Sequence, residues 1–199
     1  DPPMTDPRIA DLERSVPGLR LKTDPADLEH YGRDWTRRWT PAPLAIALPG
    51  SIEDVQAVVR WAKTNAVAIV PSGGRTGLSG GAVAANGELV VSLERMNRVL
   101  GFDAIDRTLT VQAGIPLQLA QDAAREHGLH YPVDFASRGS CTIGGTIATN
   151  AGGIRVVRAF GRERSEERSY RVSQNLLFRK NVQANDLELA ADAAWNALI

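Results

Sequence analysis

PSGGRTGLSGG, residues 71–81, places five glycines in eleven positions directly after the apolar run VAIV at residues 67–70. The apolar run predicts a buried strand, and the glycines predict a loop at its carboxyl end. Because glycine lacks a Cβ and tolerates positive φ, several amide N–H groups can converge there on the oxygens of a phosphate or pyrophosphate. The stretch therefore predicts an anion-binding loop; the alternative is a flexible or hairpin turn.

A second glycine-rich stretch, GSCTIGGTIATNAGG at residues 139–153, holds five more glycines among small and hydroxyl residues. Two such loops in one chain predict a single extended ligand. Neither loop is a P-loop, because no Lys follows its glycines, and neither carries the Rossmann pattern GxGxxG on a first strand-to-helix turn. Mononucleotide kinase and NAD chemistry are therefore disfavoured.

Together these motifs resemble those of the FAD-linked oxidases and dehydrogenases of the vanillyl-alcohol oxidase type. Within that family they resemble the D-2-hydroxyacid dehydrogenases, including D-lactate, glycolate and D-2-hydroxyglutarate dehydrogenases. The resemblance runs from about residue 34 to residue 158 and keeps the family's order: residues 71–81, then Pro132 and Asp134, then residues 139–153, with Thr146 where Asn is usual. The triplet DWT at residues 34–36 and ALPGSIEDVQAVVRWA at residues 47–62 resemble the start of the family's domain.

The resemblance implies a bound FAD, with its pyrophosphate on the first loop and its flavin along the second. It implies non-covalent FAD, because Arg75 stands where relatives with covalent FAD often carry a histidine. The cofactor-binding residues that it implies are Pro71, Ser72, Gly73, Gly74, Arg75, Thr76, Gly77, Leu78, Ser79, Pro132, Asp134, Gly139, Ser140, Thr142, Ile143, Gly144, Gly145, Thr149, Asn150 and Gly153. The family's catalytic and metal-binding residues belong to a substrate domain that we expect to be absent from this chain, so no catalytic residue is assigned.

The fold class expected is α+β. The sequence predicts helices at residues 9–12, 25–31, 51–65 and 116–127, and buried strands at residues 44–48 and 67–71 that form a parallel βαβ unit. Helical apolar spacing indicates the helix at residues 51–65, and Pro116 and Gly128 mark the ends of the helix at residues 116–127. From Glu88 onward, ELVVSL, NRVLGFD and RTLTVQAG alternate as half-buried antiparallel strands do. The resemblance gives this fold as a PCMH-type FAD-binding domain, with a small parallel βαβ sheet and a second, mainly antiparallel sheet, incomplete at the C-terminal end.

Residues 1–158 are expected to form the FAD-binding domain, with subdomains of about residues 1–92 and 93–158. Residues 159–199 depart from the family pattern and read as an Arg-rich loop followed by a terminal helix. The region from residue 155 to residue 180 carries eight basic and three acidic side chains, which is typical of a solvated segment.

Composition narrows the function classes. The 199 residues carry 23 basic and 23 acidic side chains, so the charge balance does not favour nucleic acid or an anionic membrane as the main partner. No apolar run reaches the roughly 18 residues that a membrane span needs. A single cysteine permits no internal disulfide and points to a reducing interior, so a cytoplasmic location is expected.

Several residues have two readings. Arg75 could pair with phosphate or face water. Cys141 could attach flavin, but free cysteine is more commonly a small buried hydrophobe. A metal site at His127 and His130 is not expected, because no third ligand stands at a suitable spacing. Asp134 could accept from FAD or cap a turn.

The segment of residues 35–39 holds Trp35 and Trp39 around two arginines. A nucleic-acid stacking patch is one reading of this pattern. A packed helix face or an anchored segment is the more common one.

The sequence thus predicts the FAD-binding portion of a flavin-dependent D-2-hydroxyacid dehydrogenase. The complete enzyme would oxidise a small-molecule D-2-hydroxy acid to the 2-oxo acid by hydride transfer to FAD, and pass electrons to an acceptor protein or a quinone. The prediction allows for a homodimer. Two alternatives stay open: a non-catalytic nucleotide-binding module, and a truncated remnant that binds a partner through its tail.

Overall fold

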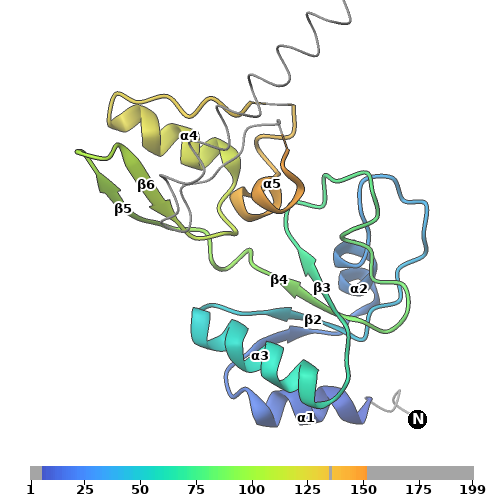
Figure 1. Cartoon of the computed structure of the whole chain (residues 1–199). Coiled ribbons are helices and arrows are strands. Elements are labelled where there is room, and N and C mark those ends of the chain that lie inside the picture. The colour runs from blue at the N-terminus through green and yellow to red at the C-terminus, as the bar shows by residue number, and fades with distance from the viewer. Residues whose placement is uncertain (1–5, 135, 152–199) are drawn as a thin grey trace, which may run out of the picture. The chain divides into compact units, whose positions relative to one another are not determined.

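In the computed structural model, residues 6–134 and 136–151 are described (Figure 1). Their helices are α1 (Pro7–Ser15), α2 (Pro25–Tyr31), α3 (Ile52–Thr64), α4 (Leu117–Glu126) and α5 (Ile143–Thr149). Their strands are β1 (Arg20–Lys22), β2 (Ala45–Leu48), β3 (Ile69–Ser72), β4 (Leu89–Ser92), β5 (Val99–Asp103) and β6 (Thr108–Val111). This mixture of helices and two separate sheets confirms the α+β prediction. The predictions for residues 159–199 lie outside the described residues.

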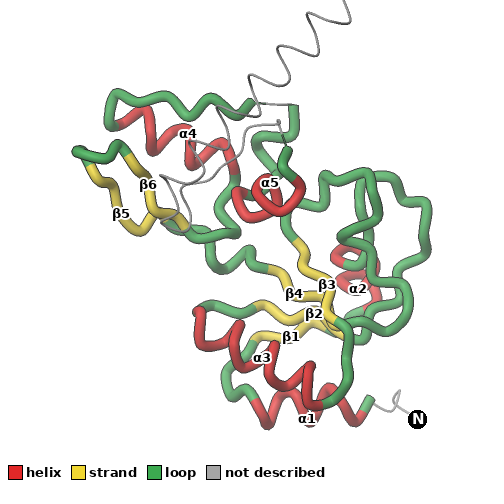
Figure 2. The backbone as a smooth tube through the Cα atoms, in the orientation of Figure 1, coloured by secondary structure: helices red, strands yellow, loops and turns green. Residues whose placement is uncertain are grey.

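The first sheet has the strand order β1-β2-β4-β3, as the yellow segments of Figure 2 show. Strands β2, β4 and β3 run parallel, while β1 pairs antiparallel with β2. Helix α3 connects β2 to β3, so the predicted parallel direction of these strands is confirmed. They do not pair directly, however, because β4 lies between them.

The prediction that β4 is a half-buried antiparallel strand is wrong. It is parallel to both neighbours and buried at every position. Leu89 and Val91 join the hydrophobic cluster on one face of the sheet, and Val90 joins the cluster on the other. Since helices cover both faces, the strand reads as a continuous apolar run rather than an alternating one.

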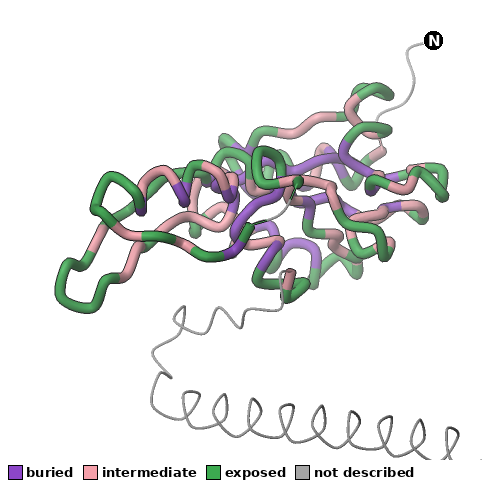
Figure 3. The backbone as a smooth tube through the Cα atoms, turned by 90° about the horizontal axis from the view of Figure 1, so that it is seen from above, coloured by how far each residue is buried: buried purple, intermediate pink, exposed green. Residues whose placement is uncertain are grey.

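Two hydrophobic cores sandwich this sheet. On one face, Ile9 and Leu12 of α1 and Val58 of α3 pack against the odd-numbered positions of β2 and β4. On the other face, Tyr31 of α2 packs against the even-numbered positions. Strands β2 and β4 are buried at every position, and Figure 3 shows the buried stretches of the backbone in purple. Burying one such large apolar side chain stabilises the fold by roughly 1.5–3 kcal/mol.

Helix α3 begins as the sequence predicts. The Ser51 hydroxyl accepts a hydrogen bond from the Asp54 amide at 3.1 Å, and the Asp54 carboxylate accepts one from the Gly50 amide at 2.8 Å. This reciprocal pair satisfies amides at the helix start that have no partner within the helix.

The second sheet is the antiparallel hairpin of β5 and β6, which confirms the predicted antiparallel strands. Strand β5 is exposed at every position except Phe102, so the prediction that it is half-buried is wrong. Helix α4 has Pro116 as its N-cap and His127 as its C-cap, and Gly128 follows with a φ of +70°, as its Pro and Gly signals predict. Ile115, Leu117, Val133 and Ile143 form the core beneath it.

The segment of residues 34–39 is not helical, so the packed-helix-face reading of its two tryptophans is wrong. Arg37 adopts a φ of +53°, which a right-handed helix cannot accommodate. Trp35 is 71% exposed and Trp39 is 45% exposed. Among the described residues, no helix is long and apolar enough to cross a membrane.

Candidate functional site

The first glycine loop leaves the carboxyl end of β3, where the chain emerges from the parallel sheet. Its main feature is a run of uncommitted amides, by which we mean backbone N–H groups that donate no hydrogen bond within the described residues. The backbone N–H groups of residues 73–79 donate to no acceptor within the described part of the chain. Residues 73–76 are half-buried and residues 77–79 are exposed. Seven consecutive amides are therefore available to a ligand that carries acceptor oxygens.

The two glycine stretches meet at the start of this loop. A Cβ on Gly73 would lie 2.6 Å from the Thr142 hydroxyl oxygen, and a Cβ on Gly74 would lie 2.0 Å from the Ser140 carbonyl oxygen. Both distances are too short for a side chain. Only glycine therefore allows the first loop to lie flat against residues 140–142.

Positive φ has a smaller role in the loop than the sequence predicts. Gly73, Gly74 and Gly77 have no positive φ, whereas Arg75 (+55°) and Gly80 (+79°) do. The first glycines are required by lack of space, and the left-handed turn of the chain falls on an arginine. Arg75 therefore needs contacts that offset the strain of this conformation.

The second glycine stretch is not a loop throughout, because it contains helix α5. Thr142 caps this helix by accepting from the Gly145 amide at 3.3 Å. The Gly144 amide donates to the Ala113 carbonyl at 2.8 Å, and a Cβ on Gly144 would lie 2.9 Å from the Ala113 Cβ. The hydroxyl cap and this close approach explain a short helix where glycine alone indicates a loop.

The groups left for a ligand in the second stretch are at its two ends. The Gly144 and Gly145 amides already have acceptors, and the Thr149 hydroxyl donates to the Gly145 carbonyl at 2.8 Å. Ser140 and Asn150 are exposed, and Asn150 ends the helix with a φ of +50°. Cofactor contacts by these residues stay a prediction, and Gly153 lies outside the described residues.

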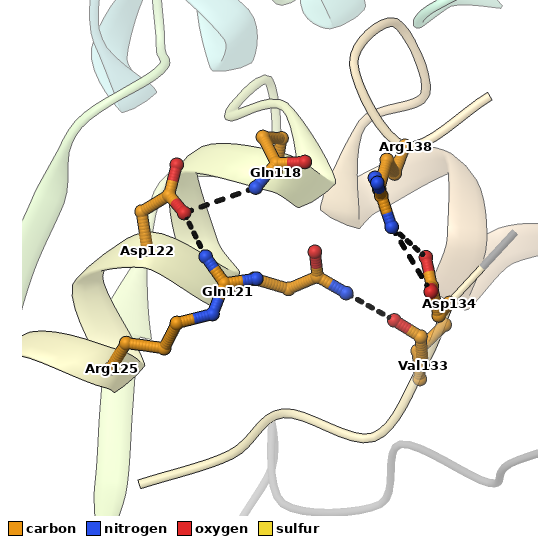
Figure 4. Close-up of polar contacts among 7 residues, drawn as sticks. All are labelled: Gln118, Gln121, Asp122, Arg125, Val133, Asp134 and Arg138. Carbon is orange, nitrogen blue, oxygen red and sulfur yellow. Dashed lines mark hydrogen bonds and ion pairs between the residues drawn. The ribbon is translucent and has the colours of Figure 1, made fainter. Parts of the chain in front are cut away.

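Asp134 forms an ion pair, which neither of its sequence readings included. Both of its carboxylate oxygens lie 3.1 Å from Nη1 of Arg138 (Figure 4). On the neighbouring α4, Gln121 donates to the Val133 carbonyl at 2.6 Å and so fixes the segment that carries Pro132 and Asp134. Both of those residues are exposed, and their contact with a cofactor stays a prediction.

Cys141 and His127 give no sign of chemistry of their own. The Cys141 thiol is buried, and burial raises its pKa, so it is a protonated and weak nucleophile. His127 stacks on Phe102 at 3.8 Å between ring centroids. In the described residues, no three or more His, Cys, Asp and Glu side chains come together in a group that could hold a metal ion.

Asp34 is a part of the site that the sequence analysis missed. Its carboxylate is almost fully buried and accepts from the Thr36 amide (2.9 Å), the Thr36 hydroxyl (2.7 Å) and the Gly80 amide (3.1 Å). The Trp35 amide also donates to the Gly77 carbonyl at 3.3 Å. Asp34 thus anchors the far end of the first loop. The available signal was the Asp-x-Thr spacing, which is typical of a side-chain-capped turn.

We expect Asp34→Asn to loosen this anchor, because an amide group would place a donor against another donor. Burial raises the pKa of Asp34, but the hydrogen bonds from Thr36 and Gly80 outweigh it and the pKa is lowered overall. Its stabilisation is therefore present above the ordinary carboxyl pKa of 3.8 and is lost as the pH falls through the lowered value. Urea unfolding should give a lower midpoint for the variant at neutral pH, and the difference should shrink in acid.

The matched control is Asp24→Asn, because Asp24 precedes α2 without capping it through its side chain. An Asp34→Asn variant as stable as this control at neutral pH would contradict the anchor.

Comparison with known proteins agrees with this geometry. A family model described as FAD binding domain matches residues 43–162. The D-2-hydroxyglutarate dehydrogenase of Xanthomonas citri pv. viticola is 79% identical over 155 residues, covering 78% of this chain and 33% of the relative. That of Stutzerimonas stutzeri is 56% identical over 156 residues, covering 78% and 34%. The chain therefore spans about a third of the length of the curated relatives that it matches.

A solved structure of alkyldihydroxyacetonephosphate synthase matches the fold with a TM-score of 0.66 and 26% identity, covering 74% of this chain and 30% of that one. The described residues thus have the architecture of the PCMH-type FAD-binding domain that the sequence predicts.

Proposed function

The chain belongs to the FAD-binding domain family, and we propose that it is the FAD-binding part of a dehydrogenase that oxidises D-2-hydroxyglutarate. The substrate is taken from the names of the two similar bacterial relatives, which are both D-2-hydroxyglutarate dehydrogenases. The relatives are about three times longer than the matched region, so the complete reaction involves residues beyond this chain.

The observation that carries the proposal is the run of uncommitted amides at residues 73–79. A dinucleotide cofactor brings a pyrophosphate rich in acceptor oxygens, and these amides fit that chemistry. We assign the pyrophosphate to the amides of Gly73, Gly74, Thr76, Gly77 and Ser79. Ser140, Thr142, Thr149 and Asn150 of the second stretch, with Gly144 and Gly145, would line the rest of the cofactor.

The contribution of this chain is to bind and orient. When bound, FAD supplies the acceptor for a hydride from the α-carbon of a hydroxy acid, and the electrons then pass to a separate acceptor. The first loop holds the anionic part of the ligand at the carboxyl edge of the parallel sheet. Contact between Gly74 and residues 140–141 fixes the second stretch against the first, so both act on one ligand.

We propose that the flavin is bound non-covalently. Arg75 occupies the position of the attachment histidine in some relatives, and a guanidinium forms no such bond. The Cys141 thiol is buried and protonated, so it is not placed to attack the flavin. An acceptor protein or quinone, and a cytoplasmic location, belong to the same proposal.

An absorbance spectrum of the purified chain, loaded with FAD and desalted, tests this function. We expect flavin bands that move entirely into the supernatant when the protein is precipitated with acid. Yellow colour in the pellet would contradict non-covalent binding. A colourless chain that also fails to take up added FAD would contradict the FAD site itself, and would favour a remnant with another role.

A further inference from the structure

The Arg75 guanidinium contacts other residues of the protein, although Arg75 sits in the middle of the anion-binding loop. Nη1 of its guanidinium donates to the Gly73 carbonyl at 3.1 Å and to the Ser72 hydroxyl at 3.4 Å. Nη2 lies 3.0 Å from Nε2 of His30 on α2. Since Arg is always a donor, Nε2 of His30 must be the acceptor, so this imidazole is neutral.

A second residue of α2 supports the same guanidinium. The guanidinium carbon of Arg75 lies 4.7 Å from the ring centroid of Tyr31, which is the geometry of a cation–π interaction. The Tyr31 ring is buried, and its hydroxyl donates to the Glu94 carboxylate at 2.8–2.9 Å. Tyr31 is therefore a fixed surface for Arg75.

We propose that Arg75, His30, Tyr31 and Glu94, named here the Arg75 network, hold the first glycine loop in the conformation that binds the FAD pyrophosphate. Arg75 is then a positioning residue that acts through its own loop. Its contacts offset the strain of its left-handed φ, and they hold the Gly73 carbonyl away from the ligand. The proposal rests on the proposed FAD site and adds α2, which no sequence motif connected with it.

The His30 contact makes the network sensitive to acid. Protonation of Nε2 removes the acceptor and sets a positive charge against the Arg75 guanidinium. The pKa of His30 is lowered from its ordinary 6.5 by partial burial and then by Arg75 and Arg33, while Asp27 and Glu94 oppose the shift. The network is therefore intact at neutral pH and is lost as the pH falls below 6.5 through the lowered value.

FAD titration of the full chain tests the network. We expect His30→Ala to weaken FAD binding by about tenfold at neutral pH, the effect of losing one charge-assisted hydrogen bond. His30→Gln keeps an acceptor that does not titrate, so it should bind like wild type at neutral pH. Wild-type binding should weaken in acid by about the same tenfold, and His30→Gln should not. His127→Gln, which removes a histidine distant in sequence from the loop, should keep the wild-type pH profile.

The chain holds only three histidines, so the titration of His30 can be followed directly by NMR without FAD. In Arg75→Ala the pKa of His30 should rise towards 6.5, since a neighbouring positive charge is lost. An unchanged His30 pKa in that variant would overturn the network. The network would also be overturned if Arg75→Ala weakened FAD binding while His30→Ala bound FAD normally at every pH. In that case Arg75 would contact the ligand itself. Wild type that binds no FAD would contradict the proposed function instead, and the NMR result alone would decide on the network.

Discussion

Gly74→Ala is expected to abolish retention of FAD. The new Cβ would lie 2.0 Å from the Ser140 carbonyl oxygen and 2.8 Å from the Cys141 Cα, and neither backbone atom can rotate away as a side-chain tip could. The two glycine stretches must then separate, which moves the amides of residues 73–79 away from the residues that would hold the rest of the cofactor. We expect FAD affinity to fall by at least about a hundredfold, equivalent to roughly 2.7 kcal/mol.

The control for this variant is Gly81→Ala in the same loop. No atom of the described residues lies within 4 Å of a Cβ built on Gly81, and its φ is not positive, so FAD binding and stability should stay close to wild type. Retention of FAD by Gly74→Ala at wild-type affinity would contradict the packed arrangement of the two stretches.

Gly77→Val tests whether the bound anion lies over Gly77, because the new side chain would meet the ligand there and not the protein backbone. A Cβ on Gly77 also meets no atom of the described chain within 4 Å. The new Cβ should therefore not disturb the fold, and a bound anion over this part of the loop would clash with the new side chain. Unchanged FAD binding by Gly77→Val would remove Gly77 from the proposed pyrophosphate site.

The parts of the fold that the sequence predicts are those with local signals. Ser51 and Asp54 mark the start of α3 because both partners of the cap lie within four residues. The alternating pattern predicts β5 and β6, whose partner strand is their neighbour in the chain. The apolar run of β4 is itself the signal of a strand buried on both faces, but its partners, β2 and β3, are distant in sequence, so no local pattern shows that it pairs parallel with them.

The candidate site, like the fold, is predicted from the sequence only where its signals are local. Its glycine stretches are visible in the sequence, but the reason for glycine at position 74 is the backbone of residues 140–141, more than sixty positions away. His30 and Tyr31 carry no motif, since an ordinary surface helix and a phosphate-loop support have the same local pattern. Long-range contacts therefore decide the role of Arg75, and the sequence left that role undecided.

These contacts hold the first loop at three places while its amides stay available. Residues 140–142 lie against its start, the Arg75 network holds its middle, and Asp34 anchors its end through Gly80. A loop that hydrogen-bonded its own amide N–H groups would have no donors left for a ligand. A loop that keeps these N–H groups available must therefore be held in place by contacts with other parts of the chain.

Gly114→Ala should be the substitution most damaging to the fold, although Gly114 lies in neither glycine stretch. A Cβ there would lie 1.8 Å from the Leu93 carbonyl oxygen and 2.9 Å from the Met96 carbonyl oxygen. The Gly114 amide also donates to the Met96 carbonyl at 2.9 Å. Leu93 directly follows β4, and Gly114 leads from β6 towards α4, so this contact joins the segments that carry the two sheets.

Overpacking against backbone should lower the free energy of unfolding of Gly114→Ala by about 3 kcal/mol or more, measured by urea denaturation. Gly101→Ala in β5 is the matched control, because a Cβ built there meets no atom within 4 Å in the part of the chain that the structure describes, and its φ is not positive. If the two variants unfold at the same urea concentration, the close contact between Gly114 and Leu93 is wrong. If Gly114→Ala is destabilised and also loses FAD while Gly101→Ala retains it, the junction between the sheets is required to bring the two cofactor-binding stretches together.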